Sequence, residues 1–378
     1  MATNPDVPTL HVDGLTVAYR NGGGWVEAVR DLSFDILPGE ACGLIGESGS
    51  GKTTAALAIM RYLPPAGAVC TGTVALEGRS LLDLDPREMV GVWGAGLALV
   101  PQDPLAALNP SLRLGEQVAE ALQVRGRLPR ADAERRVRDI FASVGLADPG
   151  RVARAYPHQA SGGMLQRVMI AMALAADPRL LILDEPTSSL DATTQATVLD
   201  LIRDLIRERR TSVLHISHNL GVLARASDRA LVLYAGELVE VADITSLYAE
   251  PLHPYTRGLL DSVPRLGANK RSVRVRSIQG RIPAPHERPS GCIFRPRCPL
   301  AIPICLQHPP LYDCGDGRRS RCHRWSEIRA RTVSARQPAP RLPAAAVPAP
   351  TDEARVIGVR DLEVSFREGD GLRALLGG

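Results

Sequence analysis

One stretch of the chain, GESGSGKT at residues 46–53, constrains the fold more than any other. The apolar run CGLIG leads into it and the helical pattern TTAALAIMRYL follows it. Glycines let the backbone curl until several N–H groups point at one phosphate, and the positive end of the following helix favours the same anion. Because strand, glycine-rich loop and helix in this order begin parallel α/β sheets, we expect an α/β fold with a phosphate-binding loop.

The polar residues of this loop have distinct expected roles. Lys52 supplies a charge to the β- and γ-phosphates of a nucleotide, and Thr53 offers its hydroxyl to Mg²⁺. The alternative is a flexible Gly/Ser loop with an incidental lysine, although Lys52 is one of only two lysines in the chain. The expected nucleotide-binding residues of the loop are Gly46, Glu47, Ser48, Gly49, Ser50, Gly51, Lys52, Thr53 and Thr54.

A second apolar run, LLIL at 180–183, ends in the acidic pair Asp184 and Glu185. At the carboxyl end of a core strand, Asp184 is placed to bind Mg²⁺ and Glu185 to polarise an attacking water. The alternative is an ordinary helix-capping turn. Beside a phosphate-binding loop, the pair indicates hydrolysis of a nucleoside triphosphate.

The rest of the chain divides by pattern. Alternating apolar residues from Leu10 to Gly46 predict antiparallel strands, whereas residues 105–160 are apolar at helical spacing and predict an inserted helical subdomain. The net charge is +4 and only 4% of residues are aromatic, so neither charge nor stacking favours a nucleic-acid partner. No apolar run approaches the roughly 18–20 residues that span a bilayer.

The stretch ASGGMLQR at 160–167 resembles the signature motif of ATP-binding-cassette (ABC) ATPases. Ala160 stands where the family usually has Leu, and Met164 where it usually has Gln. The resemblance implies a P-loop NTPase with a RecA-like parallel sheet, an antiparallel β subdomain and an inserted helical subdomain. In that family the signature contacts ATP held by the opposite cassette, so two cassettes enclose two nucleotides; the matching residues are Ser161, Gly162, Gly163 and Met164.

Further motifs match the same family in order along the chain. Gln102 resembles the Q-loop glutamine that reaches Mg²⁺ or water, and His218 the switch histidine near the γ-phosphate. Tyr19 stands where the family places an aromatic on adenine. The D-loop at the dimer contact is matched by Ser189, Leu190 and Asp191. The resemblance therefore implies catalytic roles for Glu185, His218 and Gln102 and a Mg²⁺ site at Thr53, Gln102 and Asp184.

The segment PLHPYTRGLL at 251–260 resembles the oligopeptide/dipeptide and nickel uptake branch of the ABC ATPases, as does the Cys-rich tail after it. In this tail Cys292, Cys298, Cys305 and Cys322 match that branch. The resemblance implies a [4Fe–4S] cluster, with tetrahedral Zn²⁺ and unligated reduced thiols as alternatives. Cys314 is an additional thiol without an assigned place.

The resemblance implies a function. We expect an ATP-hydrolysing subunit of a peptide importer, working with a second cassette, two transmembrane permease subunits and, indirectly, an extracytoplasmic solute-binding protein. It would lie peripherally on the cytoplasmic face of the membrane. Dipeptides, oligopeptides, glutathione and nickel stay open as solutes, and a soluble ABC ATPase acting on nucleic acid or ribosomes is the alternative function.

The chain ends with VRDLEVSFREGDGLRALLGG, which repeats the layout of DGLTVAYRNGGGWVEAVRDL near its beginning. We interpret the repeat as the start of a second cassette, so that the chain is the first part of a tandem ATPase. The expected parts are a cassette at 8–250 with a helical subdomain at about 105–175, a Cys-rich extension at 251–330, a Pro/Ala linker at 331–353 and an incomplete second cassette at 354–378.

Overall fold

The computed structural model describes residues 7–126, 129–188, 190–263 and 277–334, all within one compact unit. The predicted second-cassette start at 354–378 lies outside these residues. The Pro/Ala linker was predicted from residue 331, but helix α12 (Trp325–Ser334) continues through 331–334, so this boundary was wrong. The rest of that linker also lies outside the described residues.

An antiparallel sheet forms the N-terminal part of the unit, as the alternating pattern predicts. Its strand order is β2-β1-β4-β5. Strand β1 turns at Gly22 and Gly23 into β2, with Asn21 paired to Gly24. The four strands are β1 (Leu10–Asn21), β2 (Gly24–Ile36), β4 (Gly67–Leu76) and β5 (Arg79–Ser80).

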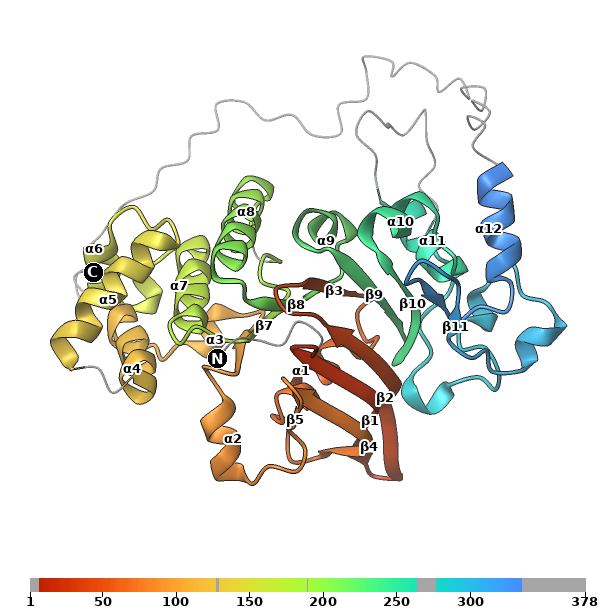
Figure 1. Cartoon of the computed structure of the whole chain (residues 1–378), viewed down its shortest axis with the longest axis horizontal. Coiled ribbons are helices and arrows are strands. Elements are labelled where there is room, and N and C mark those ends of the chain that lie inside the picture. The colour runs from red at the N-terminus through yellow and green to blue at the C-terminus, as the bar shows by residue number, and fades with distance from the viewer. Residues whose placement is uncertain (1–6, 127–128, 189, 264–276, 335–378) are drawn as a thin grey trace, which may run out of the picture. The chain divides into compact units, whose positions relative to one another are not determined.

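A mixed sheet of order β11-β12-β10-β9-β3-β8-β7-β6 forms the centre (Figure 1). Neighbouring strands from β6 to β9 are parallel, whereas β9 and β10 form an antiparallel hairpin. The strands are β3 (Ala41–Ile45), β6 (Leu97–Val100), β7 (Leu180–Asp184), β8 (Ser212–Ser217), β9 (Arg229–Tyr234), β10 (Glu237–Asp243), β11 (Tyr312–Asp313) and β12 (Arg319–Ser320).

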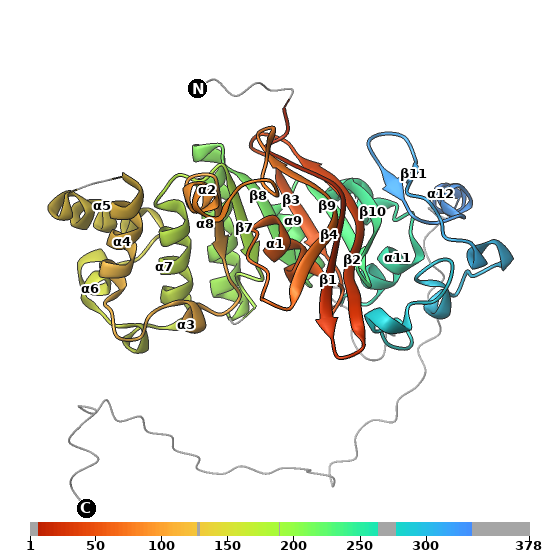
Figure 2. The same cartoon turned by 90° about the horizontal axis from the view of Figure 1, so that it is seen from below.

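Both faces of the parallel strands are buried, which explains their continuous apolar runs. In β7, Leu180 and Ile182 pack with helix α1 (Lys52–Ile59) and the antiparallel sheet. Leu181 and Leu183 point to the other face and pack with α8 (Ala192–Arg209). Figure 2 shows α1 between the two sheets. The mixed sheet therefore has a core on each face, and helix α1, which follows the phosphate-binding loop, packs in one of them.

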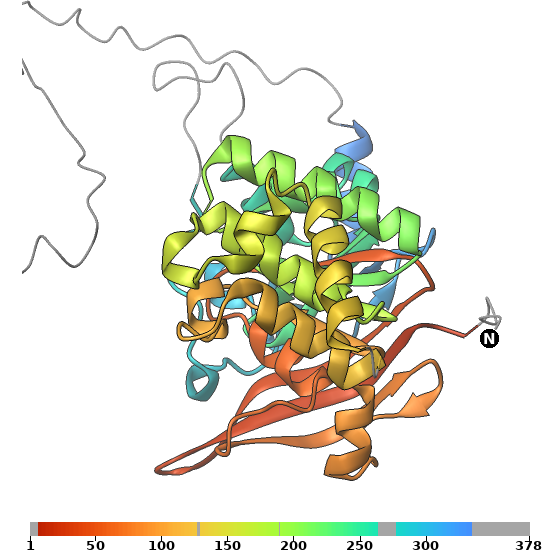
Figure 3. The same ribbon diagram turned by 90° about the vertical axis from the view of Figure 1, so that its left-hand side faces the viewer.

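The inserted helical subdomain lies at the β6 end of the mixed sheet (Figure 1). Its helices lie side by side (Figure 3), and their apolar faces form one core with α8. They are α3 (Pro104–Ala107), α4 (Leu114–Gly126), α5 (Arg130–Ser143), α6 (Pro149–Arg154) and α7 (Gly162–Leu174), with the 3₁₀ turn η1 (Pro157–Gln159). The helical subdomain was predicted at about 105–175.

The C-terminal extension adds β11 and β12 to the mixed sheet at its β10 edge. Tyr234, Tyr255 and Phe294 are buried together and tie the extension to β9. The remaining helices and turns are α2 (Pro86–Val92), α9 (Leu220–Ala226), α10 (Ile244–Ala249), α11 (Pro254–Asp261), η2 (Pro285–Glu287), η3 (Arg295–Arg297) and η4 (Pro303–Leu306).

Candidate nucleotide site

The loop between β3 and α1 has the curled backbone that phosphate binding requires. Gly49 and Gly51 adopt φ of 82° and 101°, in the left-handed region that favours glycine. A Cβ atom at Gly46 would collide with the carbonyl oxygen of Leu233 in β9, so this position also needs glycine. The N-terminus of α1 begins directly after Gly51, which places the positive end of the helix dipole at the loop.

Lys52 lies folded over the loop. Its Nζ donates to the carbonyl oxygens of Gly46 at 2.8 Å and Glu47 at 3.1 Å. The side chain is buried, and this burial lowers its pKa, while the nearby carboxylates of Glu185 and Asp184 act in the opposite direction. A buried ammonium held on backbone carbonyls is in place to exchange them for phosphate oxygens.

Asp184 ends β7 beside the loop. Its carboxylate accepts a hydrogen bond from the Thr53 side chain, and burial raises its pKa. Among the described residues, its buried Oδ1 atom has no hydrogen-bond partner. A buried carboxylate oxygen without a partner, next to a threonine hydroxyl, is a donor set that suits Mg²⁺.

Glu185 stands between two of the predicted catalytic residues. Its Oε2 accepts from Gln102 Nε2 at 3.2 Å, and its Oε1 lies 2.9 Å from His218 Nδ1. Gln102, Glu185 and His218 follow β6, β7 and β8, whose carboxyl ends meet at one edge of the sheet. The backbone of Glu185 has φ 48°, a conformation that is strained for a side-chain-bearing residue. The structure thus brings the three residues together beside the loop.

Tyr19 also lies beside the loop, since its hydroxyl is 3.4 Å from Thr54 Oγ1 at the start of α1. Gly67 allows this approach, because a Cβ there would lie 2.8 Å from the Tyr19 ring. The half-buried ring is therefore next to the position that phosphates are expected to occupy.

The signature residues lie elsewhere in the chain. Ser161 caps α7 by accepting from the Met164 backbone N–H at 3.3 Å, and the N-terminus of α7 is exposed to solvent at Ser161 and Gly162. Throughout the described ranges, these residues share no hydrogen bond or ion pair with the phosphate-binding loop.

The predicted D-loop has a structural role in the chain itself. Asp191 caps α8 by accepting from the backbone N–H groups of Thr193 and Thr194, each at 3.0 Å. Leu190 packs against the core of the helical subdomain. Ser189 lies outside the described residues.

Two residues that contact the phosphate-binding loop were not predicted from the sequence. Tyr255 accepts from the Glu47 backbone N–H at 2.9 Å, and Arg297 donates to the Glu47 carboxylate at 3.0 Å. Tyr255 lies in the HPYT segment, which resembles the oligopeptide/dipeptide uptake branch. Nothing in that segment's sequence indicates a contact with residue 47. Arg297 is one of many arginines, and nothing in the sequence distinguishes it.

The four branch-matching cysteines converge in the extension. Burial raises the pKa of the Cys322 thiol to about 12, and the nearby thiols of Cys292, Cys298 and Cys305 act in the same direction. Cys314 lies apart, where it donates to the Tyr312 carbonyl oxygen at 3.5 Å. Across the described residues, no group of three or more His, Cys, Asp or Glu side chains is arranged to hold a metal ion, so neither a cluster nor Zn²⁺ has a preformed ligand set.

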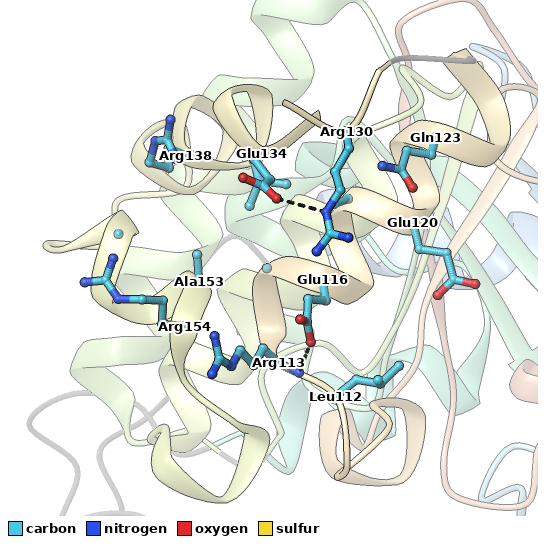
Figure 4. Close-up of a pocket in the computed structure, with 14 residues that line it drawn as sticks. Leu112, Arg113, Glu116, Glu120, Gln123, Arg130, Glu134, Arg138, Ala153 and Arg154 are labelled. Atoms are coloured by element: carbon cyan, nitrogen blue, oxygen red, sulfur yellow. Dashed lines mark hydrogen bonds and ion pairs between the residues drawn. The ribbon is translucent and has the colours of Figure 1, made fainter. Parts of the chain in front are cut away.

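A hollow of about 600 Å³ opens among α4, α5 and α6 (Figure 4). Its lining carries both signs of charge: Arg130 and Glu134, one turn apart on α5, form an ion pair at 3.2 Å. None of the predicted nucleotide residues lines it, so this hollow is not the nucleotide site.

None of the helices that the structure describes combines the length and apolar character needed to cross a membrane.

Comparisons with known families agree with the site. Residues 29–188 match the ABC transporter family, and residues 239–305 match the family described as oligopeptide/dipeptide transporter, C-terminal region. The repeat at 354–378 lies outside both ranges.

Similar proteins point the same way. A putative peptide import ATP-binding protein of Brucella melitensis is 42% identical over 315 residues, covering 83% of this chain and 94% of that protein. A dipeptide transport ATP-binding protein of Bacillus subtilis is 42% identical over 297 residues, covering 78% and 88%. A dimeric ATP-binding cassette solved in a post-hydrolysis state with ADP and Pi is 27% identical, with a TM-score of 0.57, covering 62% and 98%. The chain belongs to the ATP-binding proteins of the ABC transporters, in the oligopeptide/dipeptide import family, and is the ATPase that energises transport.

Proposed function

We propose that the chain hydrolyses ATP at the loop of residues 46–54 and that Glu185 orients the attacking water. The observation that carries the proposal is the position of the Glu185 carboxylate between Gln102 and His218. A carboxylate with one amide and one imidazole partner is held in place and still presents lone pairs to a water molecule. Lys52 then supplies the positive charge on the phosphate side of the same site.

Mg²⁺ fits the residues present. Asp184, with its unpartnered Oδ1, would hold the ion together with Thr53 and Gln102. When bound, Mg²⁺ neutralises charge on the β- and γ-phosphates. The Thr53 hydroxyl keeps the Asp184 carboxylate oriented toward the loop.

A second cassette would complete the site. The exposed α7 N-terminus, with Ser161, Gly162, Gly163 and Met164, offers backbone N–H groups to an anion outside this chain. ATP would then join two copies of the chain, or this chain and a partner cassette. Support comes from the likeness to a cassette solved as a dimer.

Peptides are the proposed solutes, and two transmembrane permeases with an extracytoplasmic binding protein are the proposed partners. The match to the oligopeptide/dipeptide transporter C-terminal region and the printed names of the relatives support this. In this arrangement the chain sits peripherally on the cytoplasmic face of the membrane.

Uptake of labelled peptides tests the function. A strain of the source organism that lacks this gene would be complemented with the wild-type chain, Glu185→Gln or Glu208→Gln, an exposed control carboxylate in α8. We expect uptake of di- or oligopeptides with the wild type and with Glu208→Gln, and none with Glu185→Gln. If the uncomplemented strain takes up peptides as fast as the strain with the wild-type chain, the chain serves another solute or process.

We also propose that Cys292, Cys298, Cys305 and Cys322 hold a [4Fe–4S] cluster. Their mutual proximity supports it, together with a fold that brings residues 292 and 305 side by side through a backbone hydrogen bond of 3.0 Å. His323, the residue after Cys322, pairs with the Tyr312 hydroxyl at 2.9 Å and the Gln307 carbonyl oxygen at 3.1 Å, so both of its ring nitrogens have partners other than a metal ion.

A further inference from the structure

Glu47, the second residue of the phosphate-binding loop, is a meeting point of contacts from inside and outside the cassette. Within the loop, its carbonyl oxygen accepts from Lys52 Nζ and from the Ser50 N–H at 3.1 Å. In the extension, Tyr255 accepts a hydrogen bond from the Glu47 N–H, and Arg297 donates to the Glu47 carboxylate. The loop is thus attached to a segment about 200 to 250 residues further along the chain.

The first outside partner is Tyr255 in α11. Its hydroxyl accepts the Glu47 N–H at 2.9 Å, and its ring is fully buried against Tyr234 and Phe294. The start of α11 is itself anchored, because the His253 ring accepts from the Tyr255 N–H at 3.1 Å. A hydroxyl carried on a ring this well packed holds its position when the loop is empty.

The second partner is Arg297 in η3, next to Cys298. Its Nη1 donates to Glu47 Oε2 at 3.0 Å and its Nη2 to Oε1 at 3.3 Å, a two-pronged contact with one carboxylate. The guanidinium side chain is only 6% exposed, while that of Glu47 is 28% exposed.

The guanidinium is also fixed on its other side. Its Nε donates to the Gln279 carbonyl oxygen at 2.8 Å, and Nη2 also reaches the carbonyl oxygens of Ile278 and Gly280 at 3.3 Å each. It further lies over the Tyr234 ring, 5.7 Å from the ring centre. A side chain with so many fixed partners holds Glu47 in one place and is not a loose surface charge.

Removal of Arg297 would have two effects on an anion site. The loop would lose an anchor, so that a smaller fraction of molecules would hold the curled backbone before ATP arrives. The Glu47 carboxylate would also lose its counter-charge next to the position of the phosphates, and would repel them. Both effects weaken binding of ATP, while a molecule that has bound ATP has an ordered loop and proceeds to hydrolysis.

We propose that Arg297 and Tyr255 are positioning residues for the phosphate-binding loop, through which the cysteine-bearing extension sets the affinity for ATP. The inference rests on the proposed use of this loop for ATP. It adds a task for the extension within the nucleotide site itself.

The experiment measures binding of Mg²⁺ and AMP-PNP, a non-hydrolysable ATP analogue, to the full chain by titration calorimetry. We expect Arg297→Gln to raise Kd on the order of tenfold and to change kcat for ATP less than twofold. Arg297→Lys, which keeps the charge without the two-pronged geometry, should recover part of the loss. Tyr255→Phe should also raise Kd, because it removes the hydroxyl that accepts the Glu47 N–H.

The matched control is Arg318→Gln. Arg318 is equally buried in the extension and pairs with Glu250 at 2.7 Å, away from the loop. This variant should lose thermal stability but keep the wild-type Kd. If Arg297→Gln and Tyr255→Phe, folded by circular dichroism, both keep the wild-type Kd, or if Arg318→Gln weakens binding as much as they do, the inference is wrong.

A double-variant cycle tests whether Arg297 acts through Glu47, and Tyr255→Phe and Arg297→Lys keep the test informative if Arg297→Gln folds poorly. Because Arg297 acts through Glu47, Glu47→Gln with Arg297→Gln should bind the analogue no worse than Arg297→Gln alone. If the two substitutions act independently, so that their fold-changes in Kd multiply in the double variant, the inference is wrong. A wild-type chain that does not bind the analogue would instead refute the proposed function.

Discussion

Gln102 Nε2 lies 3.2 Å from Glu185 Oε2, although Gln102 precedes the helical subdomain and Glu185 follows it. The contact spans 83 positions of sequence. Any rotation of the helical subdomain that draws Gln102 away therefore removes a partner from the proposed catalytic carboxylate. The position of the subdomain and the orientation of Glu185 are coupled through this one hydrogen bond.

Glu185→Gln should bind ATP and hydrolyse it roughly 10²–10⁴ times more slowly, because an amide does not accept a proton from water. The ATP-bound form should accumulate as a dimer in size-exclusion chromatography. Glu208→Gln serves as the control. Normal turnover in Glu185→Gln would assign the role to another group.

Lys52→Ala should weaken binding of Mg²⁺ and ATP by at least about tenfold, since a charge-assisted contact to phosphate is lost. Calorimetric titration of the full chain measures the change. Lys270→Ala, which changes the only other lysine, is the control. Equal affinities for all three proteins would contradict the role of Lys52.

His253→Asn should make the protein less sensitive to acid. Burial lowers the pKa of His253 to about 3, well below the ordinary value of 6.5. Between these values the unfolded chain binds a proton that the folded chain does not, so this contribution to stability is present above pH 6.5 and is lost as the pH falls.

From pH 7.5 to 5.0 the expected loss of unfolding free energy through His253 is about 2 kcal/mol. Asn keeps a side-chain oxygen as helix cap and does not titrate. Urea unfolding at both pH values compares the two proteins. The idea fails if wild type and variant lose equal stability on acidification.

Cys314→Ser should leave bound iron unchanged, whereas Cys298→Ser should abolish it, because only Cys298 lies with the converging thiols. Protein prepared without oxygen should carry roughly four irons per chain, measured by elemental analysis. Zinc in place of iron would assign a structural zinc site, and metal-free wild type would leave the thiols unligated.

Local patterns made the nucleotide loop and the acidic pair predictable. Lys52, Thr53, Asp184 and Glu185 each follow a short apolar strand, and parallel strands deliver their carboxyl ends to one edge. The family resemblance added Gln102 and His218, which the structure places on the same carboxylate.

Long-range contacts were not predictable in this way. Arg297 meets Glu47 across 250 positions, and no periodicity relates the two. Asp191 shows a different difficulty, since a residue predicted from the family at a dimer contact also caps its own helix. An aspartate suits both a helix cap and a dimer contact, so the sequence alone does not show which role Asp191 has.

The pairing of β12 with β10 has a practical consequence for anyone dissecting this protein. A fragment that stops near residue 250 retains β10 but lacks its neighbour, so that Glu240 and Val241 would face water along an unpaired strand edge. Such an edge recruits strands from other molecules and promotes aggregation. Expression of the isolated cassette should therefore yield insoluble material unless the fragment continues through Ser320.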